Sequence, residues 1–166
     1  MGTLEFLAEF KALHEKAKNG ALTPPERKHY EQARTQFGRM VVIAQQLGHT
    51  GQTLRSNLRM AKVLKVELRF GEGEPIRAST LDLASGGFAI LMGNTMKVGA
   101  SAAFSLYLPP GAGSSGPIAG RVVVASARPH GALFRVSFRF ETLHPTAQEQ
   151  LEMALIDAVL ERFSRY

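Results

Sequence analysis

Two short segments carry the residue types most suited to binding a ligand. The first holds two arginines four positions apart, Arg55 and Arg59, and the second runs from Asp82 to the glycine pair Gly86-Gly87. Taken singly, the arginines fit a solvated basic turn. An aspartate before two glycines fits a tight turn, because glycine adopts positive φ and aspartate bonds to its own backbone. Since both segments border predicted strands, we treat them together as one candidate site for an anionic ligand.

The other motifs of the sequence do not indicate an enzyme. A glycine pattern at 111–116 matches that of dinucleotide-binding folds, but prolines bracket it and a strand follows, where the motif needs the N-terminus of a helix. There is no serine elbow, no phosphate loop with a lysine, and no acid pair beyond Glu72 and Glu74. The histidines are scattered, so we expect surface or loop positions and no metal site. They are His14, His29, His49, His130 and His144.

Composition limits the class of partner and the compartment. The 166 residues carry 20 Lys and Arg against 14 Asp and Glu, a formal charge of +6 that favours nucleotides, nucleic acid or acidic protein surfaces. The basic residues are spread over helices and strands, which argues against direct nucleic-acid binding. The absence of cysteine fits a cytoplasmic protein. The longest apolar run, 40–44, is far below the roughly 20 residues of a membrane span, so we expect none.

The first fifty residues have a helical period. We expect one helix to begin after Thr3 as its N-cap and to stop at Asn19-Gly20. A second helix begins at 23–26, where Thr23 caps, proline fills the first turn and Glu26 completes a capping box, and it ends before Gly48. Together they predict an antiparallel helical hairpin. The apolar stripes are Leu4, Leu7, Phe10, Leu13 and Ala17, then Tyr30, Ala33, Phe37, Met40, Val41, Ala44 and Leu47.

From Val63 the apolar period changes to two, which is typical of strands with one buried face. We predict strands near 63–70, 76–83, 88–92, 104–108, 122–124 and 134–140, with a turn at 84–87. Six short strands at hairpin spacing favour a small antiparallel barrel or sandwich. A last helix follows Pro145 and runs to about Phe163, plugging or flanking the barrel. The predicted fold class is α+β, with a helical domain at 1–50 and a strand-rich domain, a barrel or a sandwich, at 51–166.

In this strand context the two segments resemble the PilZ domain, a bacterial receptor family for the second messenger cyclic di-GMP. The family signature is Arg-x-x-x-Arg followed by Asp/Asn-x-Ser-x-x-Gly; Arg55 and Arg59 match the first part, and Asp82 and Gly87 match the ends of the second. As in the family, the second arginine leads at once into a strand. The resemblance covers residues 52–163 and implies a six-stranded antiparallel β-barrel with a C-terminal helix. The leading hairpin is similar to an extension of some members, notably from myxobacteria.

The resemblance also implies a ligand site. Its arginines would hold phosphate oxygens and stack on bases, its aspartate would accept from a guanine edge, and its glycines would let the backbone approach the ligand. Ala84 stands where the family has serine, and a lost hydroxyl bond to a charged ligand costs roughly 1.5–3 kcal/mol, about tenfold to a hundredfold in affinity. Leu54 stands where many members have a third arginine, so we expect one bound molecule rather than a stacked pair. The site residues are Arg55, Arg59, Asp82, Ala84, Ser85, Gly86 and Gly87.

The resulting hypothesis is a non-enzymatic cyclic di-GMP receptor in the bacterial cytoplasm. It would pass the signal to an unidentified protein effector through ordering of the linker from Arg55 to Arg59. The alternative, supported by Ala84, is a PilZ-like interaction module that has lost nucleotide binding and acts as a constitutive adaptor in motility or regulation. Val42 and Ile43 lie off the apolar stripe of their helix, so that end of the hairpin would pack on the following domain or form a homodimer seam.

Overall fold

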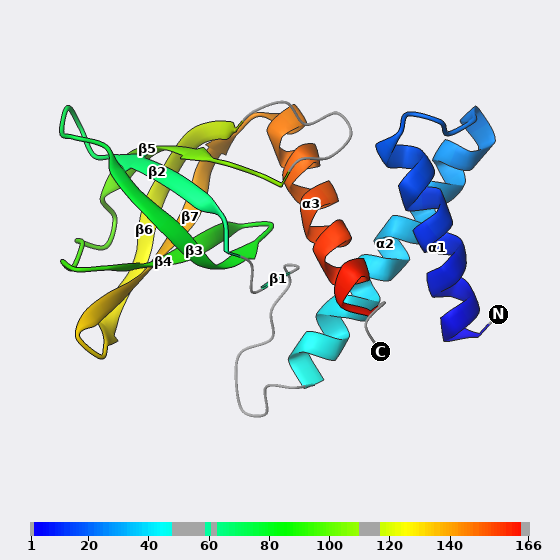
Figure 1. Ribbon diagram of the computed structural model, residues 1–166, viewed down its shortest axis with the longest axis horizontal. Coiled ribbons are helices and arrows are strands. Elements are labelled where there is room, and N and C mark those ends of the chain that lie inside the picture. Colours follow the sequence, from blue (N-terminus) through cyan, green and yellow to red (C-terminus); the bar gives the residue numbers. More distant parts are fainter. Residues whose placement is uncertain (1, 48–58, 61–62, 110–116, 164–166) are drawn as a thin grey trace. The chain divides into compact units, whose positions relative to one another are not determined.

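The computed structural model describes residues 2–47, 59–60, 63–109 and 117–163, which form two units (Figure 1). The first unit holds helices α1 (Thr3–Lys18) and α2 (Pro24–Leu47), and the second holds all the strands and helix α3 (Pro145–Phe163). The predicted domain boundary at 50/51 lies outside the described residues.

The ends of α1 are set by backbone geometry. Gly20 has a left-handed backbone (φ 66°), which lets the N–H groups of Gly20 and Ala21 bond back to the carbonyls of Ala17 and Lys16 and end the helix where predicted. At the other end, the extended residue Gly2 is the N-cap and its carbonyl accepts from the N–H of Phe6. The prediction of Thr3 as N-cap was therefore wrong by one residue.

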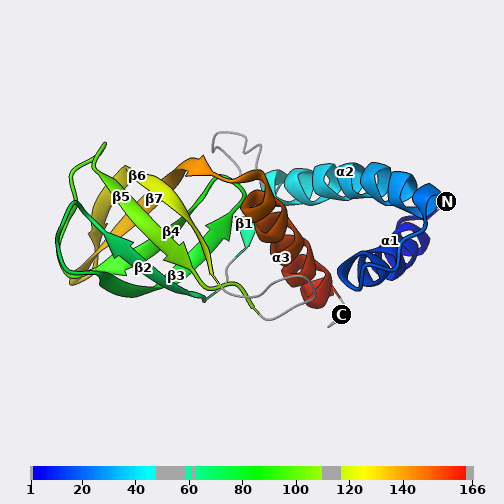
Figure 2. The ribbon, with the colours of Figure 1, turned by 90° about the horizontal axis from the view of Figure 1, so that it is seen from above.

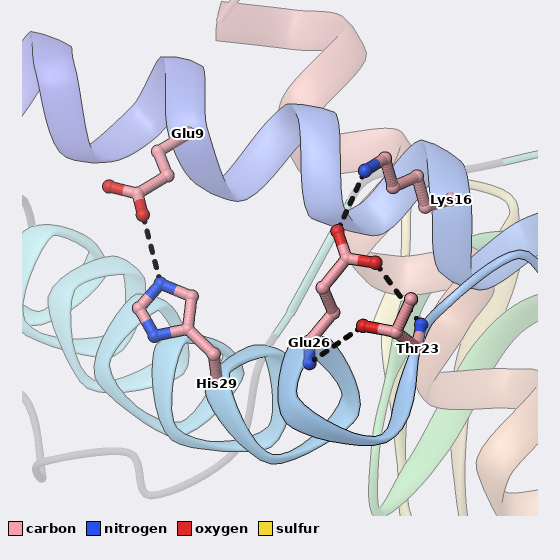
Figure 3. A network of polar contacts seen from close by, with 5 residues as sticks. All are labelled: Glu9, Lys16, Thr23, Glu26 and His29. Atoms are coloured by element: carbon pink, nitrogen blue, oxygen red, sulfur yellow. Dashed lines mark hydrogen bonds and ion pairs between the residues drawn. The ribbon is translucent and has the colours of Figure 1, made fainter.

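Helix α2 starts with the predicted capping box (Figure 3). The N–H of Glu26 donates to the hydroxyl of Thr23 (3.3 Å), and the N–H of Thr23 donates to the carboxylate of Glu26 (3.1 Å). The same carboxylate accepts from the ammonium of Lys16 on α1 (2.7 Å), and His29 bonds to Glu9 at 2.9 Å. Two polar contacts thus join the helices at their surface.

A buried aromatic cluster forms the core of this hairpin. The ring of Phe10 is fully buried and stacks on those of Phe37 (4.6 Å between centroids) and Tyr30 (5.8 Å). His14 is also fully buried and shares a 2.8 Å hydrogen bond with the hydroxyl of Tyr30, so the prediction of a surface histidine was wrong there. The bond satisfies a ring nitrogen that would otherwise be costly to bury. Leu4, by contrast, is 83% exposed because it precedes the cluster in the first turn.

The second unit is a closed antiparallel β-barrel (Figures 1 and 2). Its strands are hydrogen-bonded in the order β3-β2-β5-β6-β7-β4, and β4 pairs back with β3. The predicted six-stranded barrel is thereby confirmed, and closure pairs the outer strands that an open sheet would leave exposed. The strands are β2 (Lys65–Arg69), β3 (Ile76–Ala84), β4 (Gly87–Met92), β5 (Ser101–Leu106), β6 (Ile118–His130) and β7 (Leu133–Leu143).

Alternating apolar residues fill the barrel. Val66 and Leu68 of β2 are each 1% exposed, as the predicted period of two requires. Burying a side chain of this size contributes about 1.5–3 kcal/mol relative to leaving it in water. Four phenylalanine rings meet in the centre, with centroids 5.3–6.0 Å apart. They belong to Phe88, Phe104, Phe138 and Phe140.

Helix α3 begins at a histidine cap and lies at one end of the barrel (Figure 2). The ring of His144 accepts from the N–H of Thr146 (3.2 Å), so its loop position, as predicted, also satisfies a free helix donor. The helix contacts the short strand β1 (Arg59–Met60) and β6, which agrees with the prediction of a helix flanking the barrel. Leu151, Leu155 and Ile156 are at most 1% exposed.

Candidate functional site

The two predicted segments meet at one end of β3. A short strand, β1 (Arg59–Met60), pairs antiparallel with β3 and places Arg59 opposite Ala84 and Met60 opposite Leu83. Directly opposed residues of an antiparallel pair lie about 4.5–5.5 Å apart between their Cα atoms. The second arginine of the first segment is therefore a strand neighbour of the second segment. Leu54 and Arg55 lie outside the described residues.

Thr80 holds the chain between β1 and β2. Both strands pair with β3, and at the break between them the N–H of Thr80 donates to the carbonyl of Leu64 (2.9 Å) while its hydroxyl accepts from the N–H of Leu64 (2.9 Å). Thr80 is 1% exposed, and its hydroxyl satisfies the N–H of the buried residue Leu64, which would otherwise be costly to bury. The sequence alone does not single out Thr80, whose sole signal is a polar residue at a buried strand position.

The outer face of β3, β4 and β7 lies beside the pairing of β1 with β3, and we call this surface the floor of the candidate site. Leu83 and Phe88, directly opposite each other, are buried inward (1% and 3% exposed), so their strand neighbours face outward. Small residues dominate this floor, with one acidic and one basic side chain at its borders. Across the three strands it has two rows, Ala84, Gly87 and Arg139, and next to them Asp82, Ala89 and Ser137.

Asp82 is engaged by an arginine that the sequence did not reveal. Nη2 of Arg135 on β7 donates to Oδ2 of Asp82 on β3 at 2.5 Å, and the two side chains are only 18% and 17% exposed. Strand β4 lies between them, where Ala89 is opposite Asp82 and is itself 1% exposed. A small residue at position 89 leaves room for the ion pair to cross the strand. The available signal was the alternation Phe134-Arg135-Val136, which turns Arg135 outward.

The turn residues of the second segment also make contacts that the barrel needs. Ser85 and Gly86 connect β3 to β4 as predicted, and the carbonyl of Gly86 accepts from the N–H of Phe140 (2.9 Å). A Cβ on Gly87 would overlap the carbonyl oxygen of Phe138 and lie 2.9 Å from the carbonyl carbon. Gly87 therefore has a packing reason to be glycine, whatever it does for a ligand.

The described residues provide neither a metal site nor a membrane-spanning helix. In the part of the chain that the structure describes, no three His, Cys, Asp or Glu side chains gather in a way that could hold a metal ion. The described helices include none with the length and apolar character needed to cross a membrane.

Several solved structures resemble this chain. The PilZ domain of YcgR from Escherichia coli, solved with c-di-GMP, aligns with a TM-score of 0.54 and 18% identity over 68% of this chain and 97% of that one. MrkH of K. pneumoniae, solved as a c-di-GMP complex, gives 0.57 and 18% over 69% and 57%. The Bacillus subtilis inhibitor of motility MotI/DgrA gives 0.56 and 19% over 69% and 54%. The alignments thus span little more than half of the last two chains, and they show a shared fold.

Family membership rests on the sequence match. No curated protein matches this chain in sequence. Residues 53–157, which contain β1, the barrel and most of α3, match the PilZ domain family. This match covers well over half of the chain and includes Arg59 and the whole segment from Asp82 to Gly87. The chain therefore belongs to the PilZ domain family.

Proposed function

We propose that this protein is a receptor for cyclic di-GMP (c-di-GMP) that signals to a protein partner. One observation carries the proposal: the pairing of Arg59 with Ala84 brings the two motif segments together beside Asp82. The structures of YcgR and MrkH with c-di-GMP support it, since both share this fold. The net charge of +6 suits a ligand with two phosphodiester groups.

The residues take the following roles in the proposed site. Arg55 and Arg59 hold phosphate oxygens and stack on the guanine bases, because the planar guanidinium can do both. Asp82 accepts from a guanine edge, and the turn at Ser85-Gly86-Gly87 offers backbone groups at close range. Ala84 has no hydroxyl for this task, so we expect weaker binding than a serine would give. With Leu54 in place of a third arginine, the site takes one ligand molecule.

Signal transmission would use the segment that carries the arginines. We propose that residues 55–59 become ordered over the ligand and that the helical hairpin, domain 1–50, reports this to the effector. Hydrogen exchange of residues 48–60, with and without saturating c-di-GMP, tests this step, and equal protection in both states would refute it. A myxobacterial type of PilZ protein, cytoplasmic and without enzymatic activity, fits this role, and the hairpin could also mediate a homodimer.

A second candidate function is a constitutive adaptor that binds no nucleotide. Ala84 favours it, because residue 84 lies opposite Arg59 in the candidate site and has no hydroxyl group to bind a ligand. In this case the protein would act in motility or regulation through its surfaces alone.

Calorimetric titration with c-di-GMP separates the two candidates. The wild type is compared with Arg59→Ala and with a matched control, Arg69→Ala. Arg69 is an exposed arginine that follows Leu68, the partner of Ile76 at the opposite end of β3 from Ala84. We expect saturable one-to-one binding by the wild type and the control, and a loss of about tenfold to a hundredfold or more for Arg59→Ala. No saturable heat from the wild type would refute the receptor and favour the adaptor.

A further inference from the structure

We propose that Arg135 is a positioning residue for the ligand site and acts through Asp82. It holds the Asp82 carboxylate in one orientation and neutralises its charge, so that a dianionic ligand can lie beside it. This inference rests on the proposed function and adds a residue that lies outside both motif segments.

The geometry gives Arg135 this position. Its guanidinium reaches across β4 to Oδ2 of Asp82 at 2.5 Å, a short charge-assisted contact. Asp82 lies two residues before Ala84 on the same face of β3, and Ala84 is opposite Arg59. The ion pair is thus adjacent to the strand pairing that unites the motifs, and any ligand placed there meets Asp82 in its paired state.

Stability alone does not explain why this ion pair is present. Both side chains are more than four-fifths buried, and a buried ion pair repays its desolvation only when its other polar atoms are also satisfied. Here Nε of Arg135 is buried without a hydrogen-bond partner among the described residues. Arg135 therefore has a buried N–H donor that the barrel does not satisfy. A pair of apolar side chains at these positions would avoid this desolvation cost.

The negative charges of Asp82 and of the ligand give a reason for Arg135 to be present. Each phosphodiester of c-di-GMP carries one negative charge, and a bare carboxylate beside it would repel the ligand in a partly desolvated site. Pairing with Arg135 cancels that repulsion and leaves carboxylate lone pairs as acceptors for guanine N–H groups. Without Arg135, Asp82 would lose the ion pair that compensates its charge.

A double-mutant cycle in ligand affinity tests the proposal. Calorimetric titrations with c-di-GMP compare the wild type, Arg135→Gln, Asp82→Asn and the double variant. Arg128→Gln is the matched control, because Arg128 is an exposed arginine directly opposite Arg135 on β6. We expect Arg135→Gln to weaken binding about tenfold to a hundredfold in the wild type. In the Asp82→Asn background the same substitution should change affinity less than about threefold, since the asparagine has no charge to neutralise.

Each result of these titrations either supports or overturns the proposal. An unchanged affinity for Arg135→Gln, or an equal loss in both backgrounds, would overturn the proposal, because in the second case Arg135 would act without Asp82. Arg135→Gln also removes the ion pair of a largely buried carboxylate and could prevent folding. The double variant then remains informative, because it carries a neutral pair and should bind like Asp82→Asn. Absence of binding by the wild type would overturn the proposed function itself, and this inference with it.

Discussion

Replacing Gly87 with alanine tests how closely the motif is tied to the barrel. A Cβ at this position would overlap the carbonyl oxygen of Phe138, lie 2.9 Å from its carbonyl carbon and lie 3.1 Å from Cα of Arg139. All three are backbone atoms of β7, so rotation of a side chain cannot relieve the clash. Strands β4 and β7 must separate where the carbonyl of Gly86 accepts from the N–H of Phe140.

The expected cost follows from these contacts. Overpacking a filled interior costs about 1–3 kcal/mol, and a rigid backbone obstacle belongs at the upper end. Weakening one hydrogen bond of the ladder adds about 0.5–1.5 kcal/mol. We therefore expect Gly87→Ala to lower the free energy of unfolding by about 4 kcal/mol. For a chain of this length that corresponds to a fall in Tm of roughly 8–16 °C.

Urea denaturation followed by circular dichroism and differential scanning calorimetry measure this change. Gly93→Ala is the matched control, because a Cβ on Gly93 meets no described atom within 4 Å and its φ is not positive. This control should stay within about 0.5 kcal/mol of the wild type or gain slightly from a less flexible unfolded chain. Equal stabilities of the two variants would refute the packing argument for Gly87.

Two further predictions concern the ligand site and the hairpin. Ala84→Ser restores the family hydroxyl and should tighten c-di-GMP binding about tenfold or more in a calorimetric titration; an unchanged affinity would remove residue 84 from the site. In the hairpin, the hydrogen bond from Lys16, aided by those from Thr23, lowers the pKa of Glu26 from 4.5 to about 2. The unfolded chain then binds more protons, so the stabilisation is complete above about pH 4.5 and is lost as the pH falls towards 2. Urea unfolding at several pH values should show this slope in the wild type and a smaller one in Glu26→Gln.

Much of the fold was predictable because its signals are local. The period of two in β2 and β7 follows from burial of one strand face and indicates an antiparallel barrel or sandwich, and the resemblance to the PilZ family favoured the barrel. The capping box at Thr23 and Glu26 is readable for the same reason, since the contacts join residues three positions apart. The Thr3 cap was misplaced because a neighbouring glycine can cap through its backbone alone.

The contacts that the sequence could not predict depend on which strands and helices lie next to each other in the fold. Arg135 meets Asp82 because β7 and β3 both pair with β4, and nothing local in either segment encodes that neighbourhood. His14 was taken for a surface residue because its partner, Tyr30, lies on the other helix. The motif residues themselves were readable from their spacing, but the register that places Arg59 opposite Ala84 was not.

The central claim is that the two motif segments form one c-di-GMP site, and a ¹H–¹⁵N NMR titration tests it most directly. On addition of c-di-GMP, the account predicts saturable shifts of the backbone amides of Arg59, Met60 and the segment from Asp82 to Gly87, fitting a single Kd. The amides of the turn at 71–74, at the other end of β3, should stay unchanged. Shifts in one segment without the other, or no shifts at high ligand excess, would contradict the account.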